Sequence, residues 1–311
     1  MKSLKIVYMG SPEFAVPGLE RLYDSDHHIL AVVSNPDKRR SRGGKAVPTD
    51  LKKRALELNI PVIDAEDVQS DQFLDQIKNL QPDLLVVVAF RILPAQILEV
   101  PKMGAINLHA SLLPKYRGAA PIHWAIIRGE KETGCTVFFL NEKVDGGQII
   151  AQKRTPIGNM ETTGDLYERL KKMGSVLLKE SVDQIAEGSY TLKKQNEEEV
   201  SSAPKLFNEN TRIDFNKSAV EVHNFIRGLN PFPVAWCHYS GSKMNIYSSE
   251  ADLTMNAETG KLYVEDEKLF VGCGIGSVQI KILQLPGTKR MSGREFLNGY
   301  DTGLFLNNLE P

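Results

Sequence analysis

The chain has 311 residues, of which 41% are hydrophobic and 25% are charged, and its formal net charge is −1. This length favours about two domains, and the composition excludes disordered and fibrous proteins. The near-neutral charge also excludes a surface that is basic throughout, so any contact with nucleic acid must come from a local patch.

The first half of the sequence alternates short apolar runs with helical patterns. Residues 4–10 predict a strand, and Ser11-Pro12 offers an N-cap and a first-turn proline for a helix that runs to about Tyr23. The continuous aliphatic run 84–89 predicts a central parallel strand that is covered on both faces. Further strands are expected at 29–34, 61–63, 105–109 and 136–140, with helices at 50–58 and 71–80. The pattern predicts a doubly wound, mainly parallel α/β domain over residues 1–190.

A change of pattern follows the long helix predicted over 163–188. Residues 191–206 include a polar run and are interpreted as a linker. Another helix is expected at 219–227, and short strands at 236–239, 244–248, 261–264, 268–271 and 278–283. Short strands at near-regular spacing predict a small barrel, which places the second domain at residues 207–311.

Cysteine usage and hydropathy indicate the cellular compartment of the protein. Cys135, Cys237 and Cys273 are far apart and form no C-x-x-C pair, so neither a disulfide framework nor a cysteine zinc site is expected. We interpret them as buried, reduced thiols. No stretch approaches the roughly 20 apolar residues of a membrane helix, and the run 6–9 is too short for a secretion signal. A cytoplasmic protein with no membrane contact is expected.

The most informative stretch is residues 104–114. Asn107 and His109 are two apart on a predicted strand, so their side chains share one face near the carboxyl end of that strand. Ligands bind at this edge in open α/β sheets. Asp145 follows the strand predicted at 136–140 and is expected at the same edge, where Gly146 and Gly147 let the backbone turn sharply. An amide, an imidazole and a carboxylate can therefore converge.

These three groups suit acyl transfer to an amine that the substrate itself supplies. Asn107 can donate to an oxygen that gains negative charge, and His109 can donate to the same oxygen or pass a proton to a leaving nitrogen. Asp145 can orient His109 and accept a proton from the attacking amine. A lone histidine is usually structural, and we give that interpretation to the histidines outside this group, namely His27, His28, His123, His223 and His238.

Other chemistries have weaker support in the sequence. Ser111 has no G-x-S-x-G context for a hydrolase nucleophile. The stretch lacks the paired ligands of a metal site, so no metal is expected. Gly10 is not followed by the glycines of a dinucleotide fingerprint.

The motif Asn107-x-His109-x-Ser111-Leu112-Leu113-Pro114, followed by Asp145, resembles the signature of the folate-dependent formyltransferases. The resemblance implies a Rossmann-like catalytic domain and 10-formyltetrahydrofolate as formyl donor. It also implies that Asn107, His109 and Asp145 are catalytic and that Ser111, Leu112, Leu113 and Pro114 bind the folate.

Further segments are similar to the branch of that family that formylates methionyl-initiator tRNA. They span nearly the whole chain, at residues 9–14, 35–43, 116–122, 203–206, 213–215, 227–233, 289–291 and 295–300. The resemblance implies an OB-like second domain that contacts tRNA, and a monomer is expected. The chain departs from the family at Phe90-Arg91, where Tyr-Gly is usual.

A basic loop follows the second predicted strand. Five of the eight residues 38–45 are cationic, namely Lys38, Arg39, Arg40, Arg42 and Lys45. Such a run is often only a solvated loop, and charge alone leaves both interpretations open. With the resemblance, phosphate contacts to tRNA are favoured, with Arg42 as first choice.

Two alternatives to this activity remain. One is a formyl-folate enzyme that acts on a sugar-nucleotide amine or hydrolyses the formyl group, and the basic loop and the second domain argue against it. The other is an RNA-binding protein that has kept the fold without the chemistry, and the intact Asn107, His109 and Asp145 argue against that.

Overall fold

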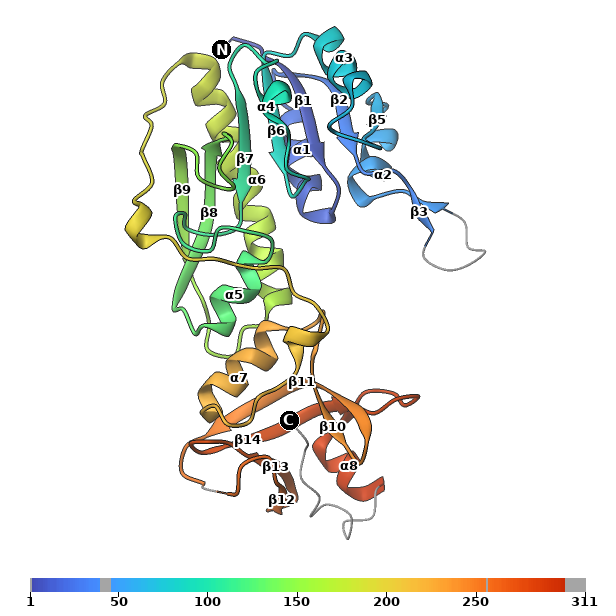
Figure 1. The fold of residues 1–311 in the computed structure, drawn as a ribbon, viewed down its shortest axis with the longest axis vertical. Helices are drawn as coiled ribbons and strands as arrows, with labels where there is room; N and C mark the ends of the chain where they lie inside the picture. The colour runs from blue at the N-terminus through green and yellow to red at the C-terminus, as the bar shows by residue number, and fades with distance from the viewer. Residues whose placement is uncertain (1, 40–45, 256, 300–311) are drawn as a thin grey trace. The chain divides into compact units, whose positions relative to one another are not determined.

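The computed structural model describes residues 2–39, 46–255 and 257–299 (Figure 1). The chain divides into two compact units. The first comprises Met1–Gly118, Gly134–Thr155 and Tyr167–Ser202, and the second comprises Ala119–Thr133, Pro156–Leu166 and Ala203–Pro311. Two short segments from before residue 167 thus pack with the carboxyl-terminal residues.

A mainly parallel sheet forms the centre of the first unit, with strand order β5-β2-β1-β6-β7-β8-β9. Its strands are β1 (Lys5–Gly10), β2 (His28–Ser34), β5 (Val62–Asp64), β6 (Leu84–Val88), β7 (Ala105–His109), β8 (Glu132–Phe139) and β9 (Ile149–Pro156). Strands β5, β2, β1, β6 and β7 pair in parallel, and the order reverses direction at β1. The predicted doubly wound α/β fold is confirmed, and β6 is central and fully buried as predicted.

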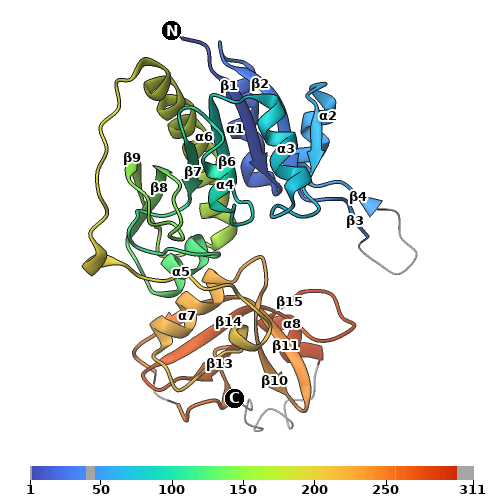
Figure 2. The same ribbon diagram turned by 45° about the horizontal axis from the view of Figure 1, so that its top comes forward.

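Helices cover both faces of this sheet (Figures 1 and 2). They are η1 (Glu13–Ala15), α1 (Val16–Tyr23), α2 (Asp50–Glu57), α3 (Asp71–Leu80), α4 (Ala95–Leu98) and α6 (Thr163–Glu187). Alternate strand residues, such as Val7 and Val87, pack with Phe73 of α3 and Ile97 of α4. The opposite side of β7 faces α6, where a side chain at Gly174 would touch Leu108.

Three details of this unit differ from the sequence predictions. Strand β8 runs antiparallel to β7, and β9 was not predicted. Ser11 does not cap the first helix, because Pro12 occupies the N-cap position of η1. The Ser11 hydroxyl instead accepts a hydrogen bond from the backbone of Asn35 at 3.2 Å, which joins the ends of β1 and β2.

The second unit contains an antiparallel sheet with strand order β10-β11-β14-β13-β12, and β15 lies beside β14. Its elements are α5 (Pro121–Ile127), η3 (Glu209–Thr211), α7 (Ala219–Gly228), β10 (Ala235–Tyr239), β11 (Ser242–Asp252), β12 (Leu262–Glu265), β13 (Lys268–Gly272), β14 (Ser277–Gln284), β15 (Met291–Ser292) and α8 (Gly293–Gly299). All five predicted strands are present. Among the described residues, no pairing between β10 and β12 closes the sheet.

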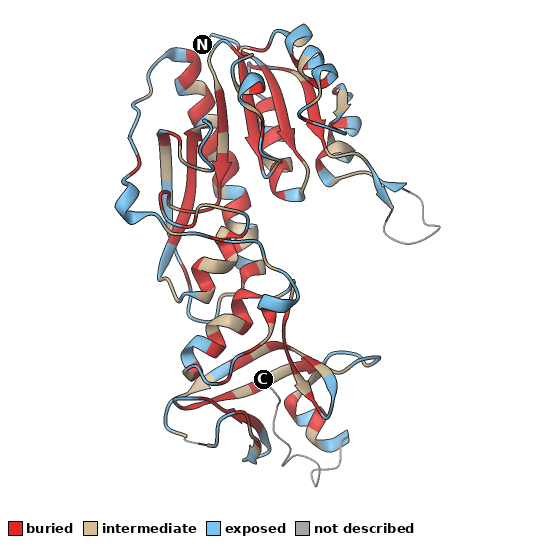
Figure 3. Cartoon of the chain, viewed as in Figure 1, coloured by how far each residue is buried: buried red, intermediate tan, exposed pale blue. Residues whose placement is uncertain are grey.

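Buried side chains follow the strands of both units (Figure 3). In the second unit, α7 begins with a capping box in which Ser218 and Glu221 satisfy each other's backbone N–H groups. Its Val222 and Ile226 pack against Ile246 and Val278 of the sheet. Burial of these apolar side chains is the main term that holds helix to sheet.

The segment predicted as a linker is attached to the first unit. Lys193 exchanges two backbone hydrogen bonds with Ile149 of β9, at 2.8 and 2.9 Å. Arg117 donates its backbone N–H to Ser201 at 2.8 Å. A short turn, η2 (Glu197–Glu199), lies between these two attachments.

Candidate functional site

Strand β7 presents Asn107 and His109 on the same face of the sheet, because they alternate with the buried Ile106 and Leu108. Asn107 is half-buried beside Val87 of β6 and Phe138 of β8. Within the part of the chain that the structure describes, no hydrogen bond engages the Asn107 amide. Its donor and acceptor are therefore available to a ligand.

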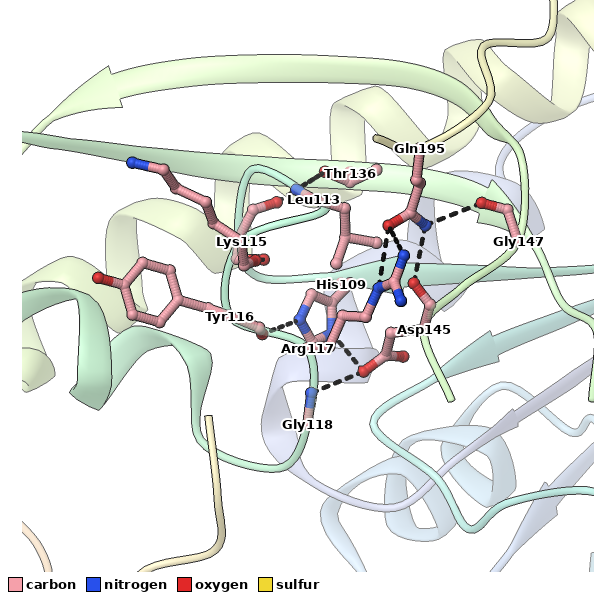
Figure 4. Close-up of polar contacts among 11 residues, drawn as sticks. His109, Leu113, Lys115, Tyr116, Arg117, Gly118, Thr136, Asp145, Gly147 and Gln195 are labelled. Atoms are coloured by element: carbon pink, nitrogen blue, oxygen red, sulfur yellow. Dashed lines mark hydrogen bonds and ion pairs between the residues drawn. The ribbon is translucent and has the colours of Figure 1, made fainter. Parts of the chain in front are cut away.

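The imidazole of His109 is held between two oxygen atoms (Figure 4). Its Nε2 lies 2.8 Å from the carbonyl oxygen of Tyr116, and this nitrogen must donate because a carbonyl only accepts. Its Nδ1 lies 3.7 Å from Oδ2 of Asp145, with side-chain exposures of 8% for His109 and 14% for Asp145. The pair is thus nearly enclosed by protein, where water screens its electrostatic interaction weakly.

Asp145 reaches His109 by a different route from the predicted one. Because β8 is antiparallel, its last residue, Phe139, lies beside Ile106 near the start of β7, while Thr136 lies beside His109. The segment 140–148 must therefore turn back along β7 by roughly 10 Å, at about 3.3 Å per residue. The predicted convergence of the two side chains is present, but a returning loop produces it instead of a parallel strand.

Close backbone packing holds this loop, which we call the Asp145 turn and define as residues 140–148. The Gly118 backbone N–H donates to Oδ2 of Asp145 at 2.8 Å. A Cβ atom at Gly147 would overlap the carbonyl oxygen of Phe139, so only glycine fits there. Asp145 has a φ of 50° and Tyr116 a φ of 63°, both in the left-handed region. Such backbone is uncommon outside glycine and concentrates at functional sites.

The Ser111–Pro114 loop is held by contacts with Lys115 and with residues of β8 and β9. The Ser111 hydroxyl donates to the carbonyl of Lys115 at 2.7 Å. Thr136 links the loop to β8: its hydroxyl donates to the carbonyl of Ser111 at 2.7 Å and accepts from the Leu113 N–H at 3.1 Å. Leu113 packs with Phe138 and Ile149, whereas Leu112 is only half-buried. The partly exposed Leu112 side chain is therefore the part of the loop that can meet a ligand.

The basic loop begins at the carboxyl edge of the sheet. Lys38 and Arg39 form β3 (Lys38–Arg39), which pairs with β4 (Ala46–Val47), and the Lys38 side chain is exposed. The carboxyl ends of β2 and β7 share one edge because both strands are parallel members of the sheet. The other predicted tRNA contacts, Arg40, Arg42 and Lys45, lie outside the described residues.

Sequence reasoning missed several residues around His109. Gln195 was assigned to a polar linker, yet it is 5% exposed and hydrogen-bonds the Asp145 turn. Arg117 contacts Gln195, and Thr136 supports the Ser111–Pro114 loop. A polar residue within a polar run carries no periodic signal, so tertiary contacts alone reveal the role of Gln195.

The described part of the chain contains no metal-binding cluster, disulfide or helix able to span a membrane. No cluster of three His, Cys, Asp or Glu side chains there is arranged to hold a metal ion. The three cysteines are free and buried as predicted, and burial raises the pKa of the Cys135 thiol to about 12. No described helix combines the length and the apolar character that a membrane span requires.

Comparison with known sequences identifies relatives over nearly the full length. Residues 4–182 match the family described as formyl transferase, and residues 205–301 match the formyl transferase C-terminal domain. The chain is 44% identical over 304 residues to the methionyl-tRNA formyltransferase of Chlorobium phaeovibrioides, covering 96% of this chain and 95% of the relative. It is 41% identical over 308 residues to that of Clostridioides difficile, covering 97% and 100%.

Solved structures share the fold at lower identity. An N-formyltransferase from Helicobacter canadensis, crystallised with folinic acid and dTDP-3-aminofucose, aligns with a TM-score of 0.69 at 24% identity. The alignment covers 89% of this chain and 98% of that one. HypX from Aquifex aeolicus in complex with tetrahydrofolic acid aligns with a TM-score of 0.64 at 16% identity, covering 99% and 48%.

Proposed function

The chain belongs to the methionyl-tRNA formyltransferases, and from this we propose that it transfers a formyl group from 10-formyltetrahydrofolate to methionyl-initiator tRNA. The observation that carries the proposal is the nearly buried pair of His109 and Asp145, with Asn107 on the same face of β7 as His109. In this arrangement, hydrogen-bond donors can stabilise the oxygen that gains negative charge, and a carboxylate can accept the proton that the attacking amine loses. Amide formation requires both.

The reaction forms a bond between the methionyl amine nitrogen and the formyl carbon and breaks the bond from that carbon to the folate nitrogen. Negative charge develops on the formyl oxygen, and the free amide of Asn107 is suited to donate to it. The attacking amine loses a proton and the leaving nitrogen gains one. We assign Asp145 to accept the first, directly or through water. The substrate amine is the nucleophile, so no side-chain nucleophile is needed.

His109 needs a change of partner before it can contact the substrate directly. Both of its ring nitrogens face protein oxygens, from Tyr116 and Asp145. We propose that substrate replaces one of these contacts, so that the freed N–H donates to the formyl oxygen or the leaving nitrogen. The other contact then keeps the ring oriented.

Folate recognition is assigned to the Ser111–Pro114 loop. The exposed part of Leu112 is suited to contact the flat ring of the donor, and Ser111, Leu113 and Pro114 hold the loop in the shape that presents Leu112. The Ser111 hydroxyl has a structural role in this assignment, since it already donates to Lys115.

Recognition of tRNA is assigned to the basic loop and the second domain. Lys38, Arg39, Arg40, Arg42 and Lys45 would contact phosphates near the methionyl end. We propose the domain limits 1–190, 191–206 and 207–311 for the catalytic domain, the linker and the tRNA-contacting domain. We also propose that the protein is a monomer and acts in the cytoplasm, where aminoacylated tRNA is used.

The test is formyl transfer from 10-formyltetrahydrofolate to charged initiator tRNA. Charged elongator methionyl-tRNA, an amino-sugar nucleotide and a reaction without acceptor serve as parallel assays. Selective formylation of the initiator supports the proposal. Transfer only to the sugar, or release of formate without an acceptor, would retain the folate chemistry and reject the tRNA assignment.

A further inference from the structure

The side chain of Gln195 joins the Asp145 turn to the segment that carries the other partner of His109. Its Nε2 donates to the carbonyl oxygens of Asp145 at 2.7 Å and of Gly147 at 2.8 Å. Its Oε1 accepts from Nε and Nη2 of Arg117, at 3.1 and 2.8 Å (Figure 4). Both amide protons and both acceptor positions are used, so the orientation of this buried amide is fixed by its contacts.

Arg117 is held on the other side by Glu197. Its two terminal nitrogens each lie 3.2 Å from a carboxylate oxygen of Glu197. This hydrogen bonding lowers the pKa of the Glu197 carboxyl below its ordinary value. The Arg117 side chain is 13% exposed and that of Glu197 is 56% exposed. Glu197 thus forms the outer end of the chain of contacts, where water weakens its electrostatic interaction with Arg117. Gln195 forms the inner end.

Both oxygen partners of His109 depend on backbone that this chain of contacts fixes. Arg117 is flanked by Tyr116, whose carbonyl accepts from His109, and by Gly118, whose N–H donates to Asp145. The carboxylate that faces His109 belongs to the residue whose own carbonyl Gln195 binds. A shift at Gln195 would therefore move both sides of the imidazole together.

The Asp145 turn needs support from outside itself. Residues 141–144 are exposed, and Asp145 adopts a left-handed backbone conformation that residues other than glycine rarely adopt. The bonds from Gly146 to Lys143 and from Lys143 to Asn141 are internal to the turn. Gln195 supplies two hydrogen bonds from another segment, and the one to Gly147 is buried, so its loss is costly because the Gly147 carbonyl cannot turn to water.

We propose that Gln195 is a positioning residue for formyl transfer: it holds the Asp145 turn so that the Asp145 carboxylate stays against His109. The inference rests on the proposed function for its catalytic consequence, while the positioning itself is a property of the fold. Gln195 contacts neither substrate in this account and acts only through Asp145.

The test replaces Gln195→Met, which keeps the length of the side chain and removes its four hydrogen bonds. The turnover number kcat should fall about tenfold to a hundredfold, while KM for tRNA and for the folate changes by less than about twofold. Glu197→Gln is the matched control, because it weakens the outer contact of Arg117 and leaves Gln195 intact. It should change kcat by less than about twofold.

A double-mutant cycle distinguishes positioning from general damage to the fold. In an Asp145→Asn background, which tolerates the left-handed backbone, Gln195→Met should reduce kcat further by less than about twofold. An equal fold-loss in both backgrounds would show that Gln195 does not act through Asp145 and would overturn the proposal.

Hydrogen exchange tests the positioning without reference to activity. Amides of residues 141–148 should exchange faster in Gln195→Met than in the wild type or Glu197→Gln, and unchanged exchange would reject the proposal. If the Met variant does not fold, Gln195→Asn keeps a polar amide one methylene shorter and should give the same effects at smaller size. A wild type that formylates no methionyl-tRNA would refute the proposed function, and the exchange data would still decide the role of Gln195.

Discussion

At the scale of single residues, the site depends on a few backbone positions that other residue types would not accept. Asp145 and Tyr116 both have left-handed backbone, and each presents an oxygen to His109. Gly147 passes so close to Phe139 that a side chain is excluded. The side chains of Asn107 and His109, by contrast, are placed by ordinary alternation along β7.

The three candidate catalytic side chains should each be needed for turnover. Asn107→Ala, His109→Ala and Asp145→Ala should each lower kcat by about a hundredfold or more, because each removes a donor or a proton acceptor from the reacting atoms. Steady-state kinetics with charged initiator tRNA measures this. His28→Ala, at an exposed histidine, is the control and should leave kcat unchanged. Near-normal rates in all three variants would refute the assigned mechanism.

Gly147→Ala should disturb both stability and activity. The added methyl group would overlap the Phe139 carbonyl, so the Asp145 turn must shift. We expect the free energy of unfolding to fall by more than about 2 kcal/mol and kcat to fall with it. Chemical denaturation and kinetics check this. At Gly158 the nearest neighbour of an added Cβ, Glu161, lies 3.4 Å away, so Gly158→Ala should behave like the wild type.

At the scale of elements, buried polar groups connect helices to strands in the second unit. In α7, the Nδ1 atom of His223 lies 3.2 Å from the hydroxyl oxygen of Ser249 in β11. Its Nε2 atom lies 3.4 Å from the carbonyl oxygen of Asn159. Burial, with a contribution from the charge of Arg227, lowers the pKa of His223 below its ordinary value. The fold thus favours the neutral form of this side chain.

This preference predicts a loss of stability in mild acid. Above the ordinary histidine pKa, near 6.5, His223 is neutral in both states and adds no pH dependence. As the pH falls below that value, the unfolded state binds a proton that the fold resists, so the free energy of unfolding decreases by up to about 1.4 kcal/mol per pH unit. His223→Gln should flatten this slope between about pH 6.5 and 5, measured by urea denaturation. His28→Gln, an exposed control, should not; equal slopes in both variants would contradict the assignment.

At the scale of the whole molecule, a net charge of −1 leaves tRNA attraction to local features. Five cations occur within residues 38–45, which follow β2 in the sequence. Phosphate contacts release counterions, so their contribution weakens as salt increases.

Removal of one cation from this loop should act on tRNA alone. Arg42→Ala should raise KM for tRNA about fivefold and reduce the slope of log KM against log salt by about one, with KM for the folate unchanged. Titrations of rate against tRNA at several salt concentrations measure both effects. Lys53→Ala, at an exposed lysine outside the loop, is the control. An unchanged salt slope would remove Arg42 from the tRNA contacts.

Local patterns in the sequence were enough to predict much of this fold. Aliphatic runs and helical periodicity predicted most strands and helices, and the i, i+2 spacing placed Asn107 and His109 on one face, because both signals arise within a few residues. The remaining features could not be predicted in this way. The antiparallel direction of β8, the return of the Asp145 turn and the burial of Gln195 depend on pairing between segments far apart in the chain. A polar residue has no hydrophobic signal, so its partners are known only after the fold brings Arg117 and Asp145 to it.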